Sequence, residues 1–490
     1  MTKFHQFIVT LCCAVLVLLP FADNYAQNAY NASKFGIKSD GITMNTRSIQ
    51  KAIDWIAEQG GGELTFWVGR YLTGSVHLRS NVTIRLQEGA VLLGSTNPYD
   101  YDKICGTYAL IIGEKCDNIQ ITGKGNVIGQ GRELANNMVA QVHAGVIQDP
   151  LKYDRVSSRP RLIYLRECNN VKISDITLKE SADWVQTYDQ CTQVVVDHIF
   201  VESTAYWNND GIDIVDCNGF LLKNSYFNSS DDAICLKSHS KDALCQNIEV
   251  RNCVARSSAS GIKFGTFGLG GFKNVKIINN KVYDTYRSAI TIQSVDGGIC
   301  ENILVDSLVA ENVGNAIYVV VGDRRQPSGK ISTMSNITIR NVTAQIYSKQ
   351  TDLAYEYPGP IEDNPRNISP SSIVGLPNSK IKNVTLENIM LNSDGGGDSN
   401  YVKITVDMLD SVPEMPQAYP EFSQFKELPA WGFFFRHVDG LEMKNIMLIT
   451  KQKDYRLPVV ADDVRNLNAS NIKALDAYYE YPVNNIIYQR

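Results

Sequence analysis

The chain has 490 residues, a formal net charge of -5 and 44% hydrophobic residues. This balance offers no basic surface of the kind that nucleic-acid-binding proteins carry, so we expect no nucleic-acid partner. The length exceeds what one compact core usually needs, but repeat architectures escape that limit because they grow by adding units along one axis.

The N-terminus has the pattern of a secretory signal peptide. Lys3 supplies a positive charge, an apolar run extends to Leu19, and Ala26 offers a small residue before a cleavage point. The run is shorter than the about 20 apolar residues that a membrane span needs, so a retained anchor is the less favoured alternative. We therefore expect residues 1–26 to be removed and the protein to be exported, without a membrane span, to the periplasm or the extracellular space.

The next element is an amphipathic segment from Thr46 to Gln59, which predicts a helix that Gly60, Gly61 and Gly62 terminate. This helix precedes the repeats described next. Because the first edge of a stack of strands needs covering, we expect it to act as an N-terminal cap.

One pattern recurs along the rest of the chain: a small or apolar residue, two polar residues often ending in Asn, then alternating apolar positions. Between Cys168 and Cys300 the copies are 23 to 28 residues apart, which is the period of a solenoid. The alternation, as in NVKISDITL, indicates strands, and stacked units would bury a continuous Val/Ile/Leu core. The copies begin at Cys116, Cys168, Cys191, Cys217, Cys245, Phe272, Cys300, Met334, Ile381, Val438 and Val464.

The repeats predict an all-β fold, a right-handed parallel β-helix, because crossovers between parallel strands are right-handed. We predict one domain over residues 27–490, with long loops at Gln350 to Ser379 and Asn392 to Ala430, and we expect a monomer. Nine cysteines follow the signal segment. Their spacing fits neither a disulfide framework nor metal-binding pairs, so we expect most to be buried free thiols.

Aligning the second strand of each unit brings several aspartates together. Neighbouring strands lie about 4.8 Å apart, so Asp210 and Asp232 would be adjacent, with Asp231 beside them. Aspartates often simply occupy turns, but like charges this close raise at least one pKa, which benefits a glycosidase and not a structural protein. The predicted outward row is Asp183, Asp210, Asp232, Ser260, Ser288 and Asn315.

Two segments carry a family resemblance. NNDGIDI from Asn208 and SDDAICLKS from Ser230 resemble the defining motifs of glycoside hydrolase family 28, which contains polygalacturonases and rhamnogalacturonases. FGIKSDGITMNTRSIQKAID, Arg159-Pro160 and YPEFSQFKELPAWGFFFR are similar to bacterial members. The resemblance implies a parallel β-helix that hydrolyses a pectic polysaccharide or oligosaccharide with inversion, using no metal or other cofactor.

By position, the resemblance implies that Asp231 is the general acid and that Asp210 and Asp232 activate water. Two family motifs are missing. Ala259-Ser260-Gly261 stands where Gly-His-Gly is usual, and Thr291-Ile292-Gln293 replaces the Arg-Ile-Lys that binds a galacturonate carboxylate. We therefore expect that unsubstituted polygalacturonate is not the preferred substrate.

The candidate substrate-binding residues are Asn208, Lys237, His239 and Lys263. Lys263 can hold a uronate as a point charge or pair with Asp232 or Asp213, and His239 has an ordinary surface role as its alternative. Three aromatic residues on the same face could stack on sugar rings or pack in the wall; they are Trp184, Tyr188 and Trp207.

Two other functions fit the same fold. A polysaccharide lyase would need calcium and a basic residue that abstracts a proton, and the hydrolase motifs disfavour it. A non-catalytic glycan-binding β-helix would have a decayed site, and the intact NND and DD motifs argue against decay.

Overall fold

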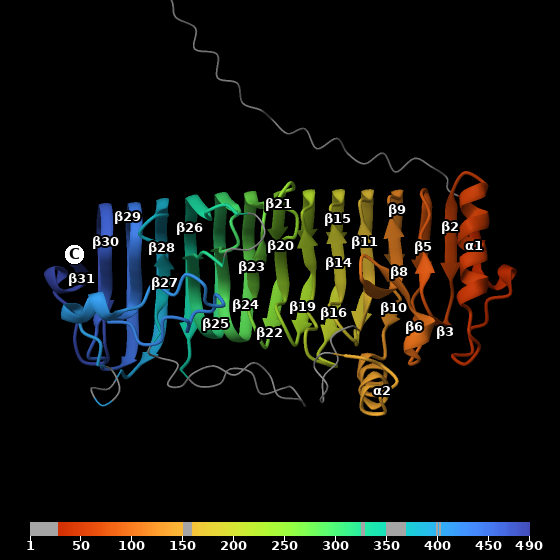
Figure 1. Cartoon of the computed structure of the whole chain (residues 1–490), viewed down its shortest axis with the longest axis horizontal. Helices are drawn as coiled ribbons and strands as arrows, with labels where there is room; N and C mark the ends of the chain where they lie inside the picture. The colour runs from red at the N-terminus through yellow and green to blue at the C-terminus, as the bar shows by residue number, and fades with distance from the viewer. Residues whose placement is uncertain (1–27, 150–158, 325–328, 349–368, 398–399, 401–402) are drawn as a thin grey trace, which may run out of the picture.

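The computed structural model describes residues 28–149, 159–324, 329–348, 369–397, 400 and 403–490. The strands stack coil upon coil into a right-handed parallel β-helix, elongated along one axis, as predicted (Figure 1). All 31 described strands belong to one sheet, and only β7 (Asp102–Ile104) and β8 (Thr107–Glu114) pair antiparallel. The predicted signal segment, residues 1–26, lies outside the described residues. Within those residues, no helix has the length and apolar character for a membrane span.

The N-terminal end of the stack is covered by helix α1 (Thr46–Glu58), within one residue of the predicted segment (Figure 1). The helix packs against β2 (Gly62–Phe66) because its apolar face turns toward the first coils. Its buried residues are Ile49, Ala52, Ile53 and Ile56.

Strands of successive coils form three ladders. The first contains β5 (Val82–Leu86), β9 (Asp117–Gly123), β12 (Asn169–Ser174), β15 (Thr192–Asp197), β18 (Asn218–Lys223) and β21 (Cys245–Arg251). The second contains β3 (Gly69–Thr73), β6 (Ala90–Gly94), β10 (Asn126–Ile128), β13 (Thr177–Lys179), β16 (Phe200–Ser203), β19 (Tyr226–Ser229) and β22 (Val254–Ser257). The third contains β4 (Val76–His77), β8, β11 (Pro160–Arg166), β14 (Gln186–Asp189), β17 (Asp213–Val215), β20 (Ile234–Ser238) and β23 (Ile262–Gly268).

Further along the chain, single long strands turn the corners and contribute to more than one ladder. They are β24 (Gly271–Ser294), β25 (Ile299–Val321), β26 (Thr333–Ile346), β28 (Ile381–Gly395), β29 (Ala430–Gln452) and β30 (Leu457–Leu475). Short strands β1 (Ala29–Asn31) and β31 (Ile487–Gln489) lie at the two ends, and helix α2 (Gly131–His143) lies beside the coils.

The core is a set of apolar rows that run from coil to coil, because the repeat places equivalent residues in register. In one row Val171 pairs with Val194, which pairs with Phe220, and all three are buried. The cysteines of the repeat occupy similar inward positions. All nine described cysteines are free and eight are buried, as expected, whereas Cys105 is exposed.

The recurring Asn residues also have a structural reason. They adopt positive φ at the turns, a conformation that the short polar side chain of Asn tolerates. Their side chains then stack: Asn274 Nδ2 donates to Asn247 Oδ1 at 3.2 Å, and Asn302 Nδ2 donates to Asn274 Oδ1 at 3.1 Å. These ladders satisfy the amides at the turns of successive coils.

One of the two segments predicted as loops contains a strand. The segment Gln350 to Ser379 contains strand β27 (Ser371–Val374), which pairs with β25 and β29, so treating the whole segment as a loop was wrong. The third ladder needs this strand to continue, and a four-residue strand is too short to show a period. Residues 403–429, here called the C-terminal insertion, contain no strand, and one short 3-10 helix (Val406–Ser411) lies in them.

Candidate active site

The outward side of the third ladder carries the candidate residues. Backbone bonds set the register: Gly211 N donates to Asp232 O at 3.0 Å, and Ala233 N donates to Ser260 O at 3.0 Å. Asp210, Asp232 and Ser260 therefore lie on adjacent coils, as the alignment predicted. The alternating positions point inward and are fully buried; they include Ile212, Ile214, Ile234, Leu236, Ile262 and Phe264.

The predicted register fails in one coil. Val185 N donates to Asp210 O at 2.8 Å, so Trp184 occupies the row position that was assigned to Asp183. The same shift turns Tyr188 into the core, where it pairs with Ile214 and is fully buried, so it is not a surface for sugar stacking. The sequence DWVQTY misled because Gln186 takes an inward position, where Tyr188 Oη donates to its Oε1 at 2.8 Å.

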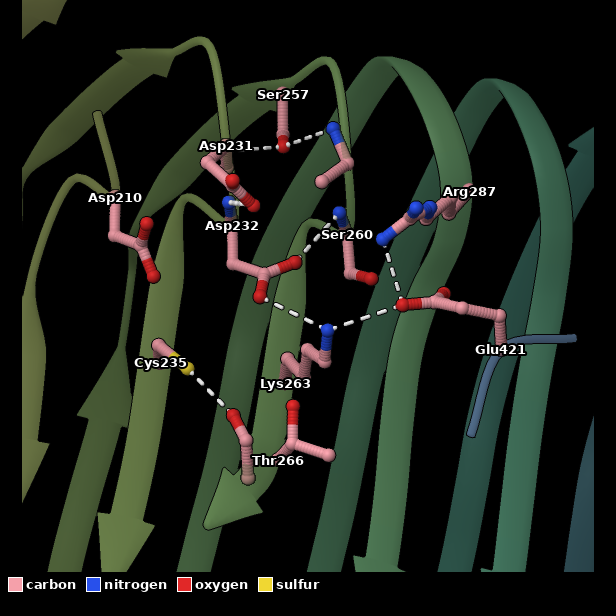
Figure 2. A network of polar contacts seen from close by, with 12 residues as sticks. Asp210, Asp231, Asp232, Cys235, Ser257, Ser260, Lys263, Thr266, Arg287 and Glu421 are labelled. Carbon is pink, nitrogen blue, oxygen red and sulfur yellow. Dashed lines mark hydrogen bonds and ion pairs between the residues drawn. The ribbon is translucent and has the colours of Figure 1, made fainter. Parts of the chain in front are cut away.

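Asp210, Asp231 and Asp232 lie side by side on neighbouring turns (Figure 2). Asp210 and Asp232 are buried, whereas Asp231 is partly exposed. One oxygen of Asp210, one oxygen of Asp232 and Cys235 Sγ all lie within 4.8 Å of one another. A single water molecule can therefore contact both buried carboxyls, since two hydrogen bonds together span a similar length.

Asp231 is held by neighbours on both oxygens. The backbone N of Asp232 donates to Oδ1 at 2.9 Å, and Asn208 Nδ2 donates to Oδ2 at 3.0 Å. Desolvation in the wall of the site raises the pKa of Asp231 above its ordinary value, and the negative charge of Asp232 acts in the same direction. Asp231 therefore keeps its proton to a higher pH than an ordinary aspartate.

The pKa of Asp232 is shifted in the opposite direction. Burial alone would raise its pKa. The positive charge of Lys263, whose Nζ is 3.1 Å from Oδ2, and the charges of more distant cations lower the pKa by more than burial raises it. Ser260 N also donates to Oδ1 at 3.0 Å. The pKa of Asp232 is therefore lowered, so this carboxyl ionises at a lower pH than that of its neighbour Asp231.

Asp210 shares the buried Lys237 with Asp213, the first residue of β17. Lys237 Nζ is 2.9 Å from Asp210 Oδ2 and also contacts Asp213. Burial raises the pKa of Asp210 well above its usual range, with Lys237 opposing, and burial raises that of Asp213 to about 6. Asp210 Oδ1 is buried without a hydrogen-bond partner in the described part of the chain, so it can accept from a water molecule.

Lys263 is itself enclosed. Its Nζ contacts Asp232 and lies 3.2 Å from Glu421 Oε1, and Arg287 lies 2.6 Å from the same Glu421 oxygen (Figure 2). The hydroxyl of Tyr419 lies 3.3 Å from Lys263 Nζ. Of the two predicted ion-pair partners of Lys263, the structure provides Asp232. Asp213 pairs with Lys237 instead, because it lies two coils away from Lys263 in the ladder register.

Sequence reasoning missed Glu421, Tyr419 and Arg287 as members of the site. Glu421 lies within YPEFSQFKELPAWGFFFR, a segment singled out for its resemblance alone, and no spacing rule links it to Lys263. Only the folded insertion brings the two residues together.

The NND segment is fixed by a buried arginine. Arg159 Nη2 donates to Trp207 O at 2.9 Å, and its guanidinium lies 4.4 Å from the Trp207 ring centre. Asn209 is buried and donates to Asp183 O at 3.0 Å. These contacts hold Asn208 so that its amide reaches Asp231.

Aromatic side chains border the site on the side of the earlier coils. Trp184 is partly exposed, and Lys237 Nζ lies 3.8 Å from its ring centre. His239 is exposed and lies between Trp184 and Phe267, with ring centres 6.4 and 5.0 Å away. Local desolvation, with Lys237 and Arg161 in support, lowers the pKa of His239 to about 4, so this ring is neutral at ordinary pH.

Asp210, Asp232 and Cys235 are close enough to suit a metal ion, but their chemistry fits one poorly. Buried ammonium groups of Lys237 and Lys263 already neutralise the two carboxylates. Burial also raises the pKa of Cys235 well above its ordinary value, which keeps the thiol protonated and a weak ligand.

The positions of the two missing family motifs are polar but uncharged. Ser260, Thr291 and Gln293 are buried on the outward side of the ladder. Ser260 Oγ, Thr291 Oγ1 and both polar atoms of the Gln293 amide have no hydrogen-bond partner among the described residues. Buried polar groups are normally satisfied, so these atoms suit water molecules.

The model of glycosyl hydrolases family 28 matches residues 65–385, more than half of the chain. The chain belongs to glycoside hydrolase family 28. It is a glycosidase of the polygalacturonase-like family. Among its relatives, the exo-poly-alpha-D-galacturonosidase of Dickeya chrysanthemi is 25% identical, covering 77% of this chain and 74% of the relative.

Solved structures show the same fold. The exopolygalacturonase of Thermotoga maritima is 22% identical with a TM-score of 0.60, covering 75% of this chain and 87% of its own. The family 28 exopolygalacturonase of Yersinia enterocolitica is 20% identical, also with a TM-score of 0.60, covering 94% of this chain and 77% of its own.

Proposed function

We propose that this family 28 glycosidase hydrolyses a pectic polysaccharide or oligosaccharide with inversion, with Asp231 as the general acid and Asp210 and Asp232 activating the water molecule. The polygalacturonase names of the relatives support the pectic class of substrate. The residue roles rest on the family motifs and on the contacts of the three aspartates.

One observation carries the roles: neighbouring Asp231 and Asp232 have pKa values shifted in opposite directions. Inverting hydrolysis needs one carboxylic acid that protonates the leaving oxygen and one carboxylate that takes a proton from water. Burial and the charge of Asp232 raise the pKa of Asp231, whereas Lys263 lowers the pKa of Asp232, so between these two pKa values Asp231 is the acid and Asp232 the base. Two adjacent aspartates therefore meet both requirements at one pH.

The position of the nucleophilic water follows from the paired carboxyls. Water between Asp210 and Asp232 would donate to the unpartnered Asp210 Oδ1 and lose its proton to the ionised carboxyl of Asp232. Since burial raises the pKa of Asp210, Asp232 is the principal base and Asp210 orients the water.

The replacement Asp231→Asn tests the acid role. The amide keeps the shape of the carboxyl but has no acid proton, so we expect turnover to fall about 10²–10⁴-fold with substrate binding largely intact. Asp242→Asn, at an exposed aspartate, is the matched control. If the Asp231→Asn enzyme keeps more than half of the wild-type turnover, Asp231 is not the acid.

The roles of the remaining candidates divide by exposure. Lys237 and Lys263 are buried against aspartates, so we propose that they act by setting the charge of those aspartates. Asn208 and His239 are accessible beside Asp231 and Trp184, and we propose that they contact the substrate.

We further propose that unsubstituted polygalacturonate is a poor substrate and that a rhamnogalacturonan-like backbone or a substituted pectic chain is cleaved faster. A hydrogen bond to a charged group contributes about 1.5–3 kcal/mol, and Thr291 and Gln293, where the family has Arg-Ile-Lys, carry no charge with which to make one. Losing about 3 kcal/mol lowers kcat/KM more than a hundredfold. Comparing kcat/KM on the separated fractions tests this, and polygalacturonate as the best substrate would contradict it.

A further inference from the structure

The outward row that passes through the active site changes from charged to largely apolar side chains within two coils of Lys263. Asp213, Cys235, Lys263 and Thr291 follow one another in register, and the row continues as Tyr318, Ser372, Phe434 and Val460. These last four residues are buried, although they point away from the core. Something outside the coils therefore covers the row beyond the active site.

The cover is the C-terminal insertion. Its apolar side chains pack with Tyr318, Phe434 and Val460 into a second hydrophobic cluster, separate from the core of the coils. In Figure 1 this light-blue segment crosses the coils near β27. The insertion contributes Leu409, Val412, Phe422, Phe425 and Leu428 to the cluster.

Polar contacts fix the insertion on that surface. Tyr318 Oη donates to Gln424 Oε1 at 2.7 Å, and Arg436 Nη1 donates to Val412 O at 2.7 Å. Asp323 N donates to Pro416 O at 2.7 Å. The insertion is thus anchored on several coils and by both kinds of contact.

The tip of the insertion reaches the active site itself. Glu421 contacts Lys263, and the hydroxyl of Tyr419 accepts from Thr266 Oγ1 at 3.0 Å. Lys263 is one coil beyond Asp232, which is a rise of about 4.8 Å. Because the outward rows run along the axis, a sugar chain lying on them meets this wall about one sugar ring past the catalytic aspartates.

We infer that the C-terminal insertion blocks one end of the outward surface that carries the three aspartates and that the enzyme cleaves at chain ends instead of within the chain. This inference rests on the proposed function. A polymer cannot pass through the wall formed by Tyr419 and Glu421, so only a chain terminus fits beside Asp232. Each cut then releases a short product of fixed size.

The test is the product profile of the wild-type enzyme on its best pectic fraction. We expect one short product from the first time point and new reducing ends without an early loss of viscosity. Oligosaccharides labelled at the reducing end show which terminus is used. A ladder of intermediate lengths with an early fall in viscosity would overturn the inference.

Variants that loosen the C-terminal insertion test whether it forms the barrier. The double replacement Phe422→Ala with Phe425→Ala removes two anchors, so the folded variant should yield intermediate lengths, while Phe200→Ala on another ladder should keep the wild-type profile. A folded double variant with an unchanged single product would show that the insertion is not the barrier.

A binding measurement distinguishes a failure of this inference from a failure of the proposed function. The Asp231→Asn enzyme, titrated calorimetrically with uncleaved chains of defined length, should bind one molecule per chain whatever the length. Several molecules per long chain would contradict a barrier at the C-terminal insertion. If no pectic fraction is bound by this variant or cleaved by the wild type, it is the proposed function that fails, and not the inference that the insertion forms a barrier.

Discussion

Replacing Lys263 by methionine isolates the charge that distinguishes Asp232 from Asp231. Lys263 is 1% exposed and lies 3.1 Å from Asp232 and 3.2 Å from Glu421. At an effective dielectric constant of about 20, a pair at this distance is stabilised by about 5 kcal/mol, an upper limit equal to about four pKa units. Without Lys263, the pKa of Asp232 should rise above the ordinary value because burial then dominates.

The expected result of Lys263→Met has two parts. Since the base is largely protonated, kcat/KM should fall by about a hundredfold or more, and the acid limb of the pH profile should move to higher pH. Buried Asp232 also loses its direct counter-ion, whereas Glu421 keeps Arg287, and breaking a buried pair in this way costs about 3–5 kcal/mol of stability.

The assay is kcat/KM against pH on the best pectic fraction, with the fold checked by circular dichroism. Lys281→Met is the matched control, because Lys281 pairs with Glu311 at 2.7 Å on the surface, where a pair contributes little. A Lys263→Met enzyme with an unchanged acid limb and nearly full activity would refute the role of Lys263. The lysine would then be a structural partner only.

Three further predictions concern the whole enzyme. Activity of the wild type should be bell-shaped in pH, falling as pH drops through the lowered pKa of Asp232 and as pH rises through the raised pKa of Asp231; a profile without a basic limb would contradict the acid. The first-formed product should have the inverted anomeric configuration by NMR and its rate should survive chelators, whereas retention, or inactivation that calcium reverses, would exclude this mechanism. The mature exported protein should begin at Gln27 on N-terminal sequencing, and an intact Met1 would refute the signal peptide.

Periodicity was enough to predict the fold. The alternation and the recurring Asn specify strands and turns, since a β-helix repeats the same inward and outward positions in every coil. The prediction failed where the period is broken: β27 is too short to show alternation, and Gln186 hides the true phase beside Asp183.

The row that carries Asp210 and Asp232 could be aligned because both residues belong to the repeat. The charged residues that shift the pKa values in this row could not be predicted from the sequence. Glu421 is 158 residues from Lys263 in sequence and lies in a segment without a period, so only tertiary packing pairs them. Lys237 likewise pairs with two residues, Asp210 and Asp213, that no local pattern links to it.

The most direct test of the account is the mass of the products from separated pectic fractions, digested with wild-type enzyme and with Asp231→Asn. Hydrolysis through Asp231 predicts saturated products that gain one water per cut in the wild-type digest and almost none from the variant. Unsaturated products, or equal digestion by both enzymes, would contradict it.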